Sequence, residues 1–238
     1  MQDQLSSVTD PERSMSSPVY GLAVPLLVAI LTLVFWDSAV LYPLKILVVL
    51  FHELSHGLAA LVSGGAIDHI EISMEQGGVC YTRGGSSFLI LNAGYLGSLI
   101  CGAVLLIAGA RTRHDRTLVG LLGVILVAVS LLYIRSAFGF AYGVATGVAL
   151  VAIAYLLPNV VSDFLLTVLG IVSCLYAIWD IGSDVIFRSV PGSDAHQLAE
   201  LTGIPSVVWG VFWIVLAVVN TIAALGLASR RVREGHTS

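Results

Sequence analysis

Residues 47–62, LVVLFHELSHGLAALV, decide how the rest of this chain is interpreted. The apolar run is interrupted by His52, Glu53 and His56, which have the spacing H-E-x-x-H. Residues four apart share one face of a helix, so both imidazoles can reach one Zn²⁺ ion, and Glu53 can accept a proton from a water activated there. Ionisable side chains inside a membrane segment are unfavourable unless they pair or bind something, which makes this group functional by default. We therefore predict a zinc site with His52 and His56 as ligands and Glu53 as general base. The alternative is a histidine-rich helix end that reaches the membrane interface.

The composition is that of an integral membrane protein. Hydrophobic residues make up 57% of the 238 residues and charged residues only 11%, whereas soluble domains have about 25% charged residues. The net charge of −4 and the lack of a basic patch argue against nucleic-acid binding. The three cysteines form no C-x-x-C pair, and Cys101 and Cys174 lie in apolar runs, so we expect core residues there rather than ligands or disulfides.

Seven apolar segments are long enough to cross a bilayer, which takes about 20 residues. We therefore predict an all-α polytopic membrane protein with about seven transmembrane helices, forming a single domain over residues 18–228. The polar, Ser-rich residues 1–17 predict a disordered tail, and residues 229–238 a basic tail. The predicted spans cover residues 19–36, 42–62, 87–110, 118–134, 137–157, 160–180 and 205–227.

The basic residues predict the orientation in the membrane. With seven spans, the loop at 111–116 and the C-terminal tail fall on one side, which carries six Lys and Arg residues against four on the other, leaving out Lys45 within a span. The positive-inside rule makes the richer side cytoplasmic. The segment that follows the H-E-x-x-H helix is then non-cytoplasmic.

In that segment the continuous apolar run gives way to alternating polar and apolar residues. Residues 63–65 (SGG) end the helix, residues 68–74 alternate between polar and apolar, and residues 75–78 (EQGG) form a turn before residues 79–83. The pattern predicts a short β-hairpin at the membrane surface. Its free edge can pair with an extended peptide, although an isolated hairpin more often packs on its neighbours.

A third zinc ligand is expected late in the chain, because a catalytic zinc commonly has three protein ligands and a water. Asp180 and Asp184 lie four apart at the end of the sixth predicted span, so both carboxylates can share one helix face. Asp180 is deeper in the apolar run, where an unpaired carboxylate is most unfavourable, and we predict it as the ligand, with Asp184 as the alternative. A helix cap or an ion pair with Arg188 would also explain Asp184.

Two other polar sites have ordinary explanations beside functional ones. Asn92 lies in the third predicted span among small residues, and it can hold a substrate carbonyl or form an interhelical hydrogen bond, the more ordinary role. Ser193 and Asp194 precede a short amphipathic pattern at 195–201, so they predict the N-cap of a short helix in a polar loop.

Together these features resemble the site-2 protease family of intramembrane zinc metallopeptidases. The resemblance covers residues 42–215 and is nearest to small bacterial members, in which W-D-I-x-x-D-like and S-D-A-like segments recur. It implies that His52, His56 and Asp180 bind zinc, that Glu53 is the general base, and that membrane-protein or peptide substrates are cut at the cell membrane of a bacterium. The chain departs from the family pattern at Asp180, which stands in W-D-I rather than in L-D-G after prolines, and it has no PDZ-like insert.

Two other functional classes stay open. A non-proteolytic transporter or chaperone could carry a structural or vestigial zinc site, but a structural site has no need of Glu53 as a base. A metal-ion transporter would carry more polar residues along its path, and the third to fifth predicted spans have almost none.

Overall fold

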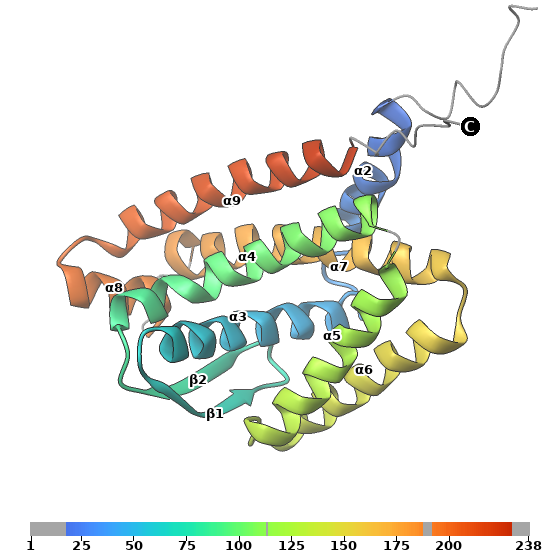
Figure 1. Ribbon diagram of the computed structural model, residues 1–238. Coiled ribbons are helices and arrows are strands. Elements are labelled where there is room, and N and C mark those ends of the chain that lie inside the picture. Colours follow the sequence, from blue (N-terminus) through green and yellow to red (C-terminus); the bar gives the residue numbers. More distant parts are fainter. Residues whose placement is uncertain (1–17, 113, 188–191, 230–238) are drawn as a thin grey trace, which may run out of the picture.

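The computed structural model describes residues 18–112, 114–187 and 192–229. Both predicted tails, the acidic one at 1–17 and most of the basic one at 229–238, lie outside these residues, as does Arg188. Eight α-helices, one π-helical segment and one two-stranded sheet make up the described part (Figure 1). The elements are α2 (Pro18–Val34), α3 (Tyr42–Val62), β1 (Ala66–Ile72), β2 (Gly78–Arg83), α4 (Ser87–Arg111), α5 (Asp115–Leu132), α6 (Ala137–Leu156), α7 (Asn159–Ile181), the π-helical η1 (Gly182–Phe187), α8 (Asp194–Thr202) and α9 (Ser206–Ser229).

The helices confirm a polytopic membrane protein. Six of them are long and apolar enough to cross a membrane: α3, α4, α5, α6, α7 with the start of η1, and α9. The first predicted span corresponds to α2, which has 17 residues and so stands at the lower end of the roughly 17–25 residues that cross a bilayer. The hairpin between α3 and α4 is the predicted exception to an otherwise helical fold.

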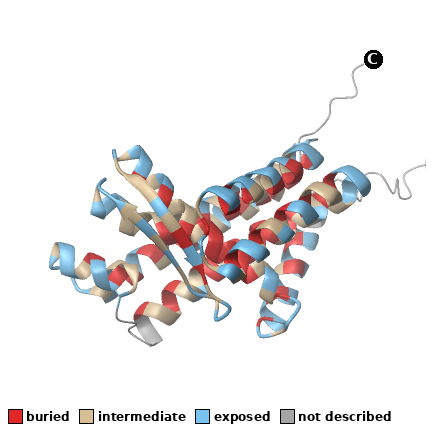
Figure 2. Cartoon of the chain, turned by 90° about the horizontal axis from the view of Figure 1, so that it is seen from below, coloured by how far each residue is buried: buried red, intermediate tan, exposed pale blue. Residues whose placement is uncertain are grey.

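Helix α3 lies at the centre of the molecule. It packs against α4, α7 and both strands, and 61% of its most apolar stretch is buried, against 22% for α9. Figure 2 shows the buried residues gathered towards the middle of the molecule and the exposed ones around them. Pro43 in its first turn fits the helix start, where a proline has no N–H bond to lose, and Gly64 after its end takes a positive φ of 87°. The H-E-x-x-H segment is therefore enclosed by other elements rather than exposed to lipid.

Close helix contacts around α3 depend on glycine. A Cβ added to Gly102 of α4 would lie 2.9 Å from the carbonyl oxygen of Gly170 in α7, so these two backbones touch without side chains between them. Such contacts are how helices associate in lipid, where burial of apolar surface gives no advantage. The small residues of the third predicted span thus allow α4 to approach α7 closely.

The two edges of the hairpin differ. Strands β1 and β2 pair antiparallel, with Ile70 opposite Cys80 and Ile72 opposite Gly78. The outer edge of β1 is occupied by the segment 133–136, since Ile70 exchanges backbone hydrogen bonds with that segment and Ile72 bonds to the Ser136 hydroxyl. In an antiparallel pair of strands, two directly opposite residues either both direct their N–H and C=O groups towards each other or both direct them away from each other. Ile70 and Ile72 direct theirs away from β2, so their partners direct theirs away from β1. Gly78 and Cys80 therefore present backbone groups along the outer edge of β2, for which the described residues provide no further strand.

The end of α7 also matters for the site. The sixth predicted span ends near Asp180 as expected, but the helix continues through Gly182 as η1, with i→i+5 geometry. Helix α8 follows, capped as predicted by Ser193, whose hydroxyl accepts a hydrogen bond from the backbone N–H of His196. The end of α7 and the start of α8 both line the cavity beside α3.

Candidate metal centre

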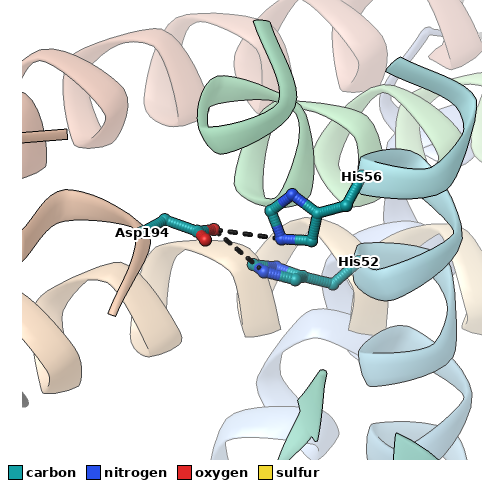
Figure 3. Close-up of side chains that lie close together, drawn as sticks. All are labelled: His52, His56 and Asp194. Carbon is teal, nitrogen blue, oxygen red and sulfur yellow. Dashed lines mark ion pairs between the residues drawn. The ribbon is translucent and has the colours of Figure 1, made fainter. Parts of the chain in front are cut away.

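Three side chains from two distant elements meet at one point (Figure 3). His52 and His56 extend from α3, and Asp194, the first residue of α8, faces them with its carboxylate. The Oδ2 atom of Asp194 lies 3.1 Å from Nε2 of His52 and 3.3 Å from Nε2 of His56. Their possible ligand atoms all lie within 4.8 Å of one another, which makes them the one such group found among the described residues. Two imidazoles and a carboxylate are a ligand set that suits zinc.

The predicted third ligand and its alternative lie nearby but outside this group. Asp180 in the last turn of α7 and Asp184 in η1 both line the cavity that contains the histidines. The sequence predicts Asp194 only at a helix N-terminus, because an Asp in that position is ordinary capping chemistry and no spacing rule links it to a histidine 138 residues earlier. The S-D-A segment noted in the family resemblance is the one sequence feature that could have drawn attention to Asp194, but it does not by itself indicate a ligand.

His56 is held in the orientation that a metal ligand needs. Its Nδ1 lies 2.7 Å from the carbonyl oxygen of Ile90 in α4, so an Nδ1–H donates there. The lone pair is then on Nε2, the atom that faces Asp194. A ligand histidine commonly has its second nitrogen fixed in this way.

The carboxylate of Asp194 is buried and incompletely satisfied by protein. Its side chain is 11% exposed, and its Oδ2, although close to both imidazoles, has no donor in hydrogen-bond geometry among the described residues. Burial by itself would raise the pKa of Asp194, but the neighbouring His56 and His52 outweigh burial and hold that pKa well below its usual range. An ionised oxygen without a donor, next to two imidazole nitrogens, is what a cation would complete.

Space for a cation is provided by Gly94 of α4. A Cβ built on Gly94 would lie 2.5 Å from Nε2 of His56 and closer still to Nε2 of His52. The missing side chain thus leaves both ligand nitrogens uncovered. The three residues and the space beside them fit a zinc ion.

Glu53 lies next to this group and against the hairpin. It is 5% exposed, and a Cβ on Gly78 would lie 2.6 Å from its Oε1, so only glycine at that position of β2 lets the carboxylate approach the strand. The carboxylate interacts with the backbone N–H of Cys80, one of the groups on the outer edge of β2. Glu53, both histidines and Asp194 line one cavity of about 560 Å³, which also reaches the hairpin turn.

Two other predicted residues have no part in this group. Asn92 makes the interhelical bond that was the more ordinary prediction, since its Oδ1 accepts from Nε1 of Trp213 in α9 at 3.0 Å. Cys80 lines the cavity, but burial and the charge of Glu53 raise the pKa of its thiol to about 12. It therefore stays protonated near neutral pH and is a poor metal ligand.

Comparison with known proteins agrees with this geometry. The Peptidase M50B-like family matches residues 25–224, which is most of the chain and includes every residue of the group. The protein belongs to the Peptidase M50B-like family. A search of curated proteins and a search of solved structures gave no match. The M50B-like assignment confirms the predicted resemblance, and with the six apolar helices it identifies a multi-pass membrane protein of a peptidase family.

Proposed function

We propose that this protein is an intramembrane zinc metalloprotease that hydrolyses peptide bonds of membrane-protein or peptide substrates in a bacterial cell membrane. One observation carries the proposal: His52, His56 and Asp194 converge beside Glu53 on a cavity that is lined by the membrane-spanning helices α3, α4 and α7, by the hairpin and by the start of α8. The membership in a peptidase family supports it.

Asp194 is the third zinc ligand in this proposal, in place of Asp180. Its carboxylate oxygen is already within 3.3 Å of both imidazole nitrogens, whereas Asp180 and Asp184 stand outside the group of three. His56 presents Nε2 because Ile90 holds its other nitrogen. Zinc bound here supplies the Lewis acid that lets a water molecule lose its proton near neutral pH.

Glu53 carries the proton transfers. Its carboxylate takes a proton from the water whose oxygen attacks the peptide carbonyl carbon, and returns it to the nitrogen when the C–N bond breaks, which leaves a carboxyl group and an amine. Burial of Glu53 against β2 holds it on the cavity side of α3.

The outer edge of β2 is suited to holding the substrate. Gly78 and Cys80 direct backbone groups along that edge, and Cys80 reaches Glu53 through its N–H. An extended peptide paired there would add a third strand with a carbonyl close to Glu53 and the histidines. A helical substrate must unwind to do this, because its own hydrogen bonds occupy the same backbone groups.

The geometry supports a catalytic rather than a structural zinc site. Structural zinc sites are closed by four protein ligands, whereas catalytic sites have three and an open position. Here three ligands border a cavity, with a buried carboxylate beside them. A transporter or chaperone with a structural site would need neither the cavity nor Glu53.

Metal content and cleavage test the proposal separately. We expect about one zinc per chain in the purified protein, lost in Asp194→Ala and kept in Asp180→Ala and Asp184→Ala. Zinc loss in Asp180→Ala with retention in Asp194→Ala would restore Asp180 as the ligand.

Glu53→Gln distinguishes a protease from a zinc-binding protein. The amide keeps the size of the side chain but cannot accept the proton, so zinc should stay bound while cleavage of a single-span substrate falls by roughly 10²–10⁴-fold. Glu75→Gln is the matched control, because Glu75 lines the same cavity but is exposed at the hairpin turn. If Glu53→Gln cells process substrates like wild type, the protein is not a protease of this kind.

A further inference from the structure

The two histidines are held in different ways. His56 donates from Nδ1 to the Ile90 carbonyl at 2.7 Å. For His52, the described residues offer no hydrogen-bond partner to Nδ1. Its ring is instead contacted by the ring of Tyr95, with 4.7 Å between the ring centroids and an interplanar angle of 82°. A ligand histidine without a hydrogen-bonded second nitrogen needs another restraint on its orientation.

Tyr95 is itself fixed at both ends. It lies on α4 and is 2% exposed, and its hydroxyl donates to Oδ2 of Asp184 at 3.0 Å. Its ring packs on the indole of Trp213 from α9, with 5.0 Å between the centroids. The ring that touches His52 is therefore held by two other elements and has little freedom to move.

The π-helical segment is what places Asp184 at Tyr95. Helix α7 continues into η1 without interruption, and Asp184 lies in the first turn of η1. A π-helical turn holds more residues than an α-helical one, so side chains after Ile181 point in directions that a continuous α-helix would not give. Such turns occur often at functional sites. Here the turn joins the end of α7 to the face of α4 that touches His52.

We propose that Tyr95 is a positioning residue for His52, and that Asp184 holds Tyr95 in place. This inference rests on the proposed zinc site. Tyr95 keeps the His52 ring at the angle at which Nε2 faces Asp194 and His56, and it does so through the near-perpendicular contact between the two rings, in place of the hydrogen bond that His56 has. Its hydroxyl is donated to Asp184 and is not free to act on a substrate.

Four substitutions test the chain of contacts from Asp184 to His52. Tyr95→Phe keeps the ring and removes the hydroxyl, Tyr95→Leu removes the ring, Asp184→Leu removes the acceptor, and Asp184→Asn restores an acceptor. The matched control is Tyr142→Phe, which likewise removes a tyrosine hydroxyl. That hydroxyl donates to the carbonyl oxygen of Pro43 in α3, and Tyr142 does not line the cavity.

Zinc affinity, measured by competition with a chelator, is the readout, together with the visible spectrum of the cobalt-substituted protein. Loss of a ligand's outer support costs about 10–100-fold in metal affinity. We expect zinc affinity to fall about 10-fold in Tyr95→Phe and in Asp184→Leu, with no further fall when the two substitutions are combined. Tyr95→Leu should lower zinc affinity more. Asp184→Asn, which keeps an acceptor for the Tyr95 hydroxyl, should bind zinc as wild type does. The cobalt spectrum should change in Tyr95→Phe, Tyr95→Leu and Asp184→Leu, and it should stay as in wild type in Tyr142→Phe.

Three results would overturn the inference. Wild-type affinity in both Tyr95→Phe and Tyr95→Leu would show that His52 needs no support from Tyr95. Complete zinc loss in Asp184→Leu with none in Tyr95→Phe would make Asp184 a ligand in its own right. A wild-type protein that binds no zinc would remove both proposals, whereas zinc binding without proteolysis would refute the protease and leave this inference to be judged by affinity.

Discussion

Replacing Gly94 with alanine should empty the metal centre and leave the fold in place. The added Cβ would lie 2.5 Å from Nε2 of His56 and closer to Nε2 of His52, whereas ordinary contacts of this kind begin at 3.4 Å. The imidazoles must therefore move by about 0.9 Å or more, while ligand distances in a metal site hold to within about 0.2 Å. A displacement several times that tolerance is incompatible with both histidines binding one zinc.

The same substitution should change stability little. The atoms in the way are the ends of two side chains, which can turn aside more easily than backbone. Overpacking of this kind costs about 1–3 kcal/mol, and alanine gains about 1 kcal/mol over glycine within a helix, so the free energy of unfolding should fall by about 0–2 kcal/mol.

Zinc content per chain and the thermal midpoint, measured on protein purified in detergent, check this prediction. Gly94→Ala should contain almost no zinc, and its midpoint should be close to that of wild-type protein from which the zinc has been removed, because bound zinc itself stabilises the native state. Gly226→Ala in α9 is the control, since a Cβ there meets nothing within 4 Å, and it should keep its zinc. A fully zinc-loaded Gly94→Ala protein would show that the two histidines do not bind one metal on the side facing α4.

Three further predictions concern the hairpin. The pKa of Cys80 is raised to about 12, so its thiol should react with alkylating reagents at pH 8 roughly 10³-fold more slowly than an ordinary exposed cysteine. The reaction should become faster as the pH rises, and faster in Glu53→Gln. An ordinary rate would contradict the half-buried position of Cys80 beside Glu53. Cys80→Pro removes the outward N–H of β2, the one that reaches Glu53, but none that pairs with β1, so it should lower peptide cleavage while zinc is kept. Cys80→Ala retains the N–H and should cleave normally. Equal cleavage by both variants would show that this N–H serves neither Glu53 nor a paired substrate. The charge bias predicts that the hairpin is non-cytoplasmic, so a cysteine placed at position 75, with Cys80 replaced, should react with an impermeant thiol reagent in intact cells. Labelling only after permeabilisation would show the opposite orientation in the membrane.

Local patterns in the sequence predicted most of the elements around the site. The switch from a continuous apolar run to alternation after residues 63–65 predicted the end of α3 and the hairpin, and the predicted turn at 75–78 lies between β1 and β2 except for Gly78, which begins β2. The Ser193 cap and α8 followed from residues within one helical turn. These features depend on neighbours in the chain, which is why a single sequence contains them.

The parts that could not be predicted depend on contacts between distant residues. Nothing near Asp194 indicates that α8 folds back to His52, and the covering of β1 by residues 133–136 has no local pattern. The π-helical turn that brings Asp184 to Tyr95 likewise has no local pattern that predicts it. Burial within the apolar run favoured Asp180 over Asp184, but depth in a segment does not tell which carboxylate meets a histidine.

The distance along the chain between the ligands has a consequence during synthesis. His52 and His56 leave the ribosome early, and Asp194 follows 138 residues after His56, a delay of roughly 7–28 s at about 5–20 residues per second. Through that interval the nascent chain has the histidines and Glu53 in the membrane but no completed ligand set. Its own unpacked apolar segments are then the nearest peptide in reach. In the proposed protease, the late arrival of Asp194 would keep the growing chain from cleaving itself, and a chain that stops before α8 would be inserted without a complete set of zinc ligands.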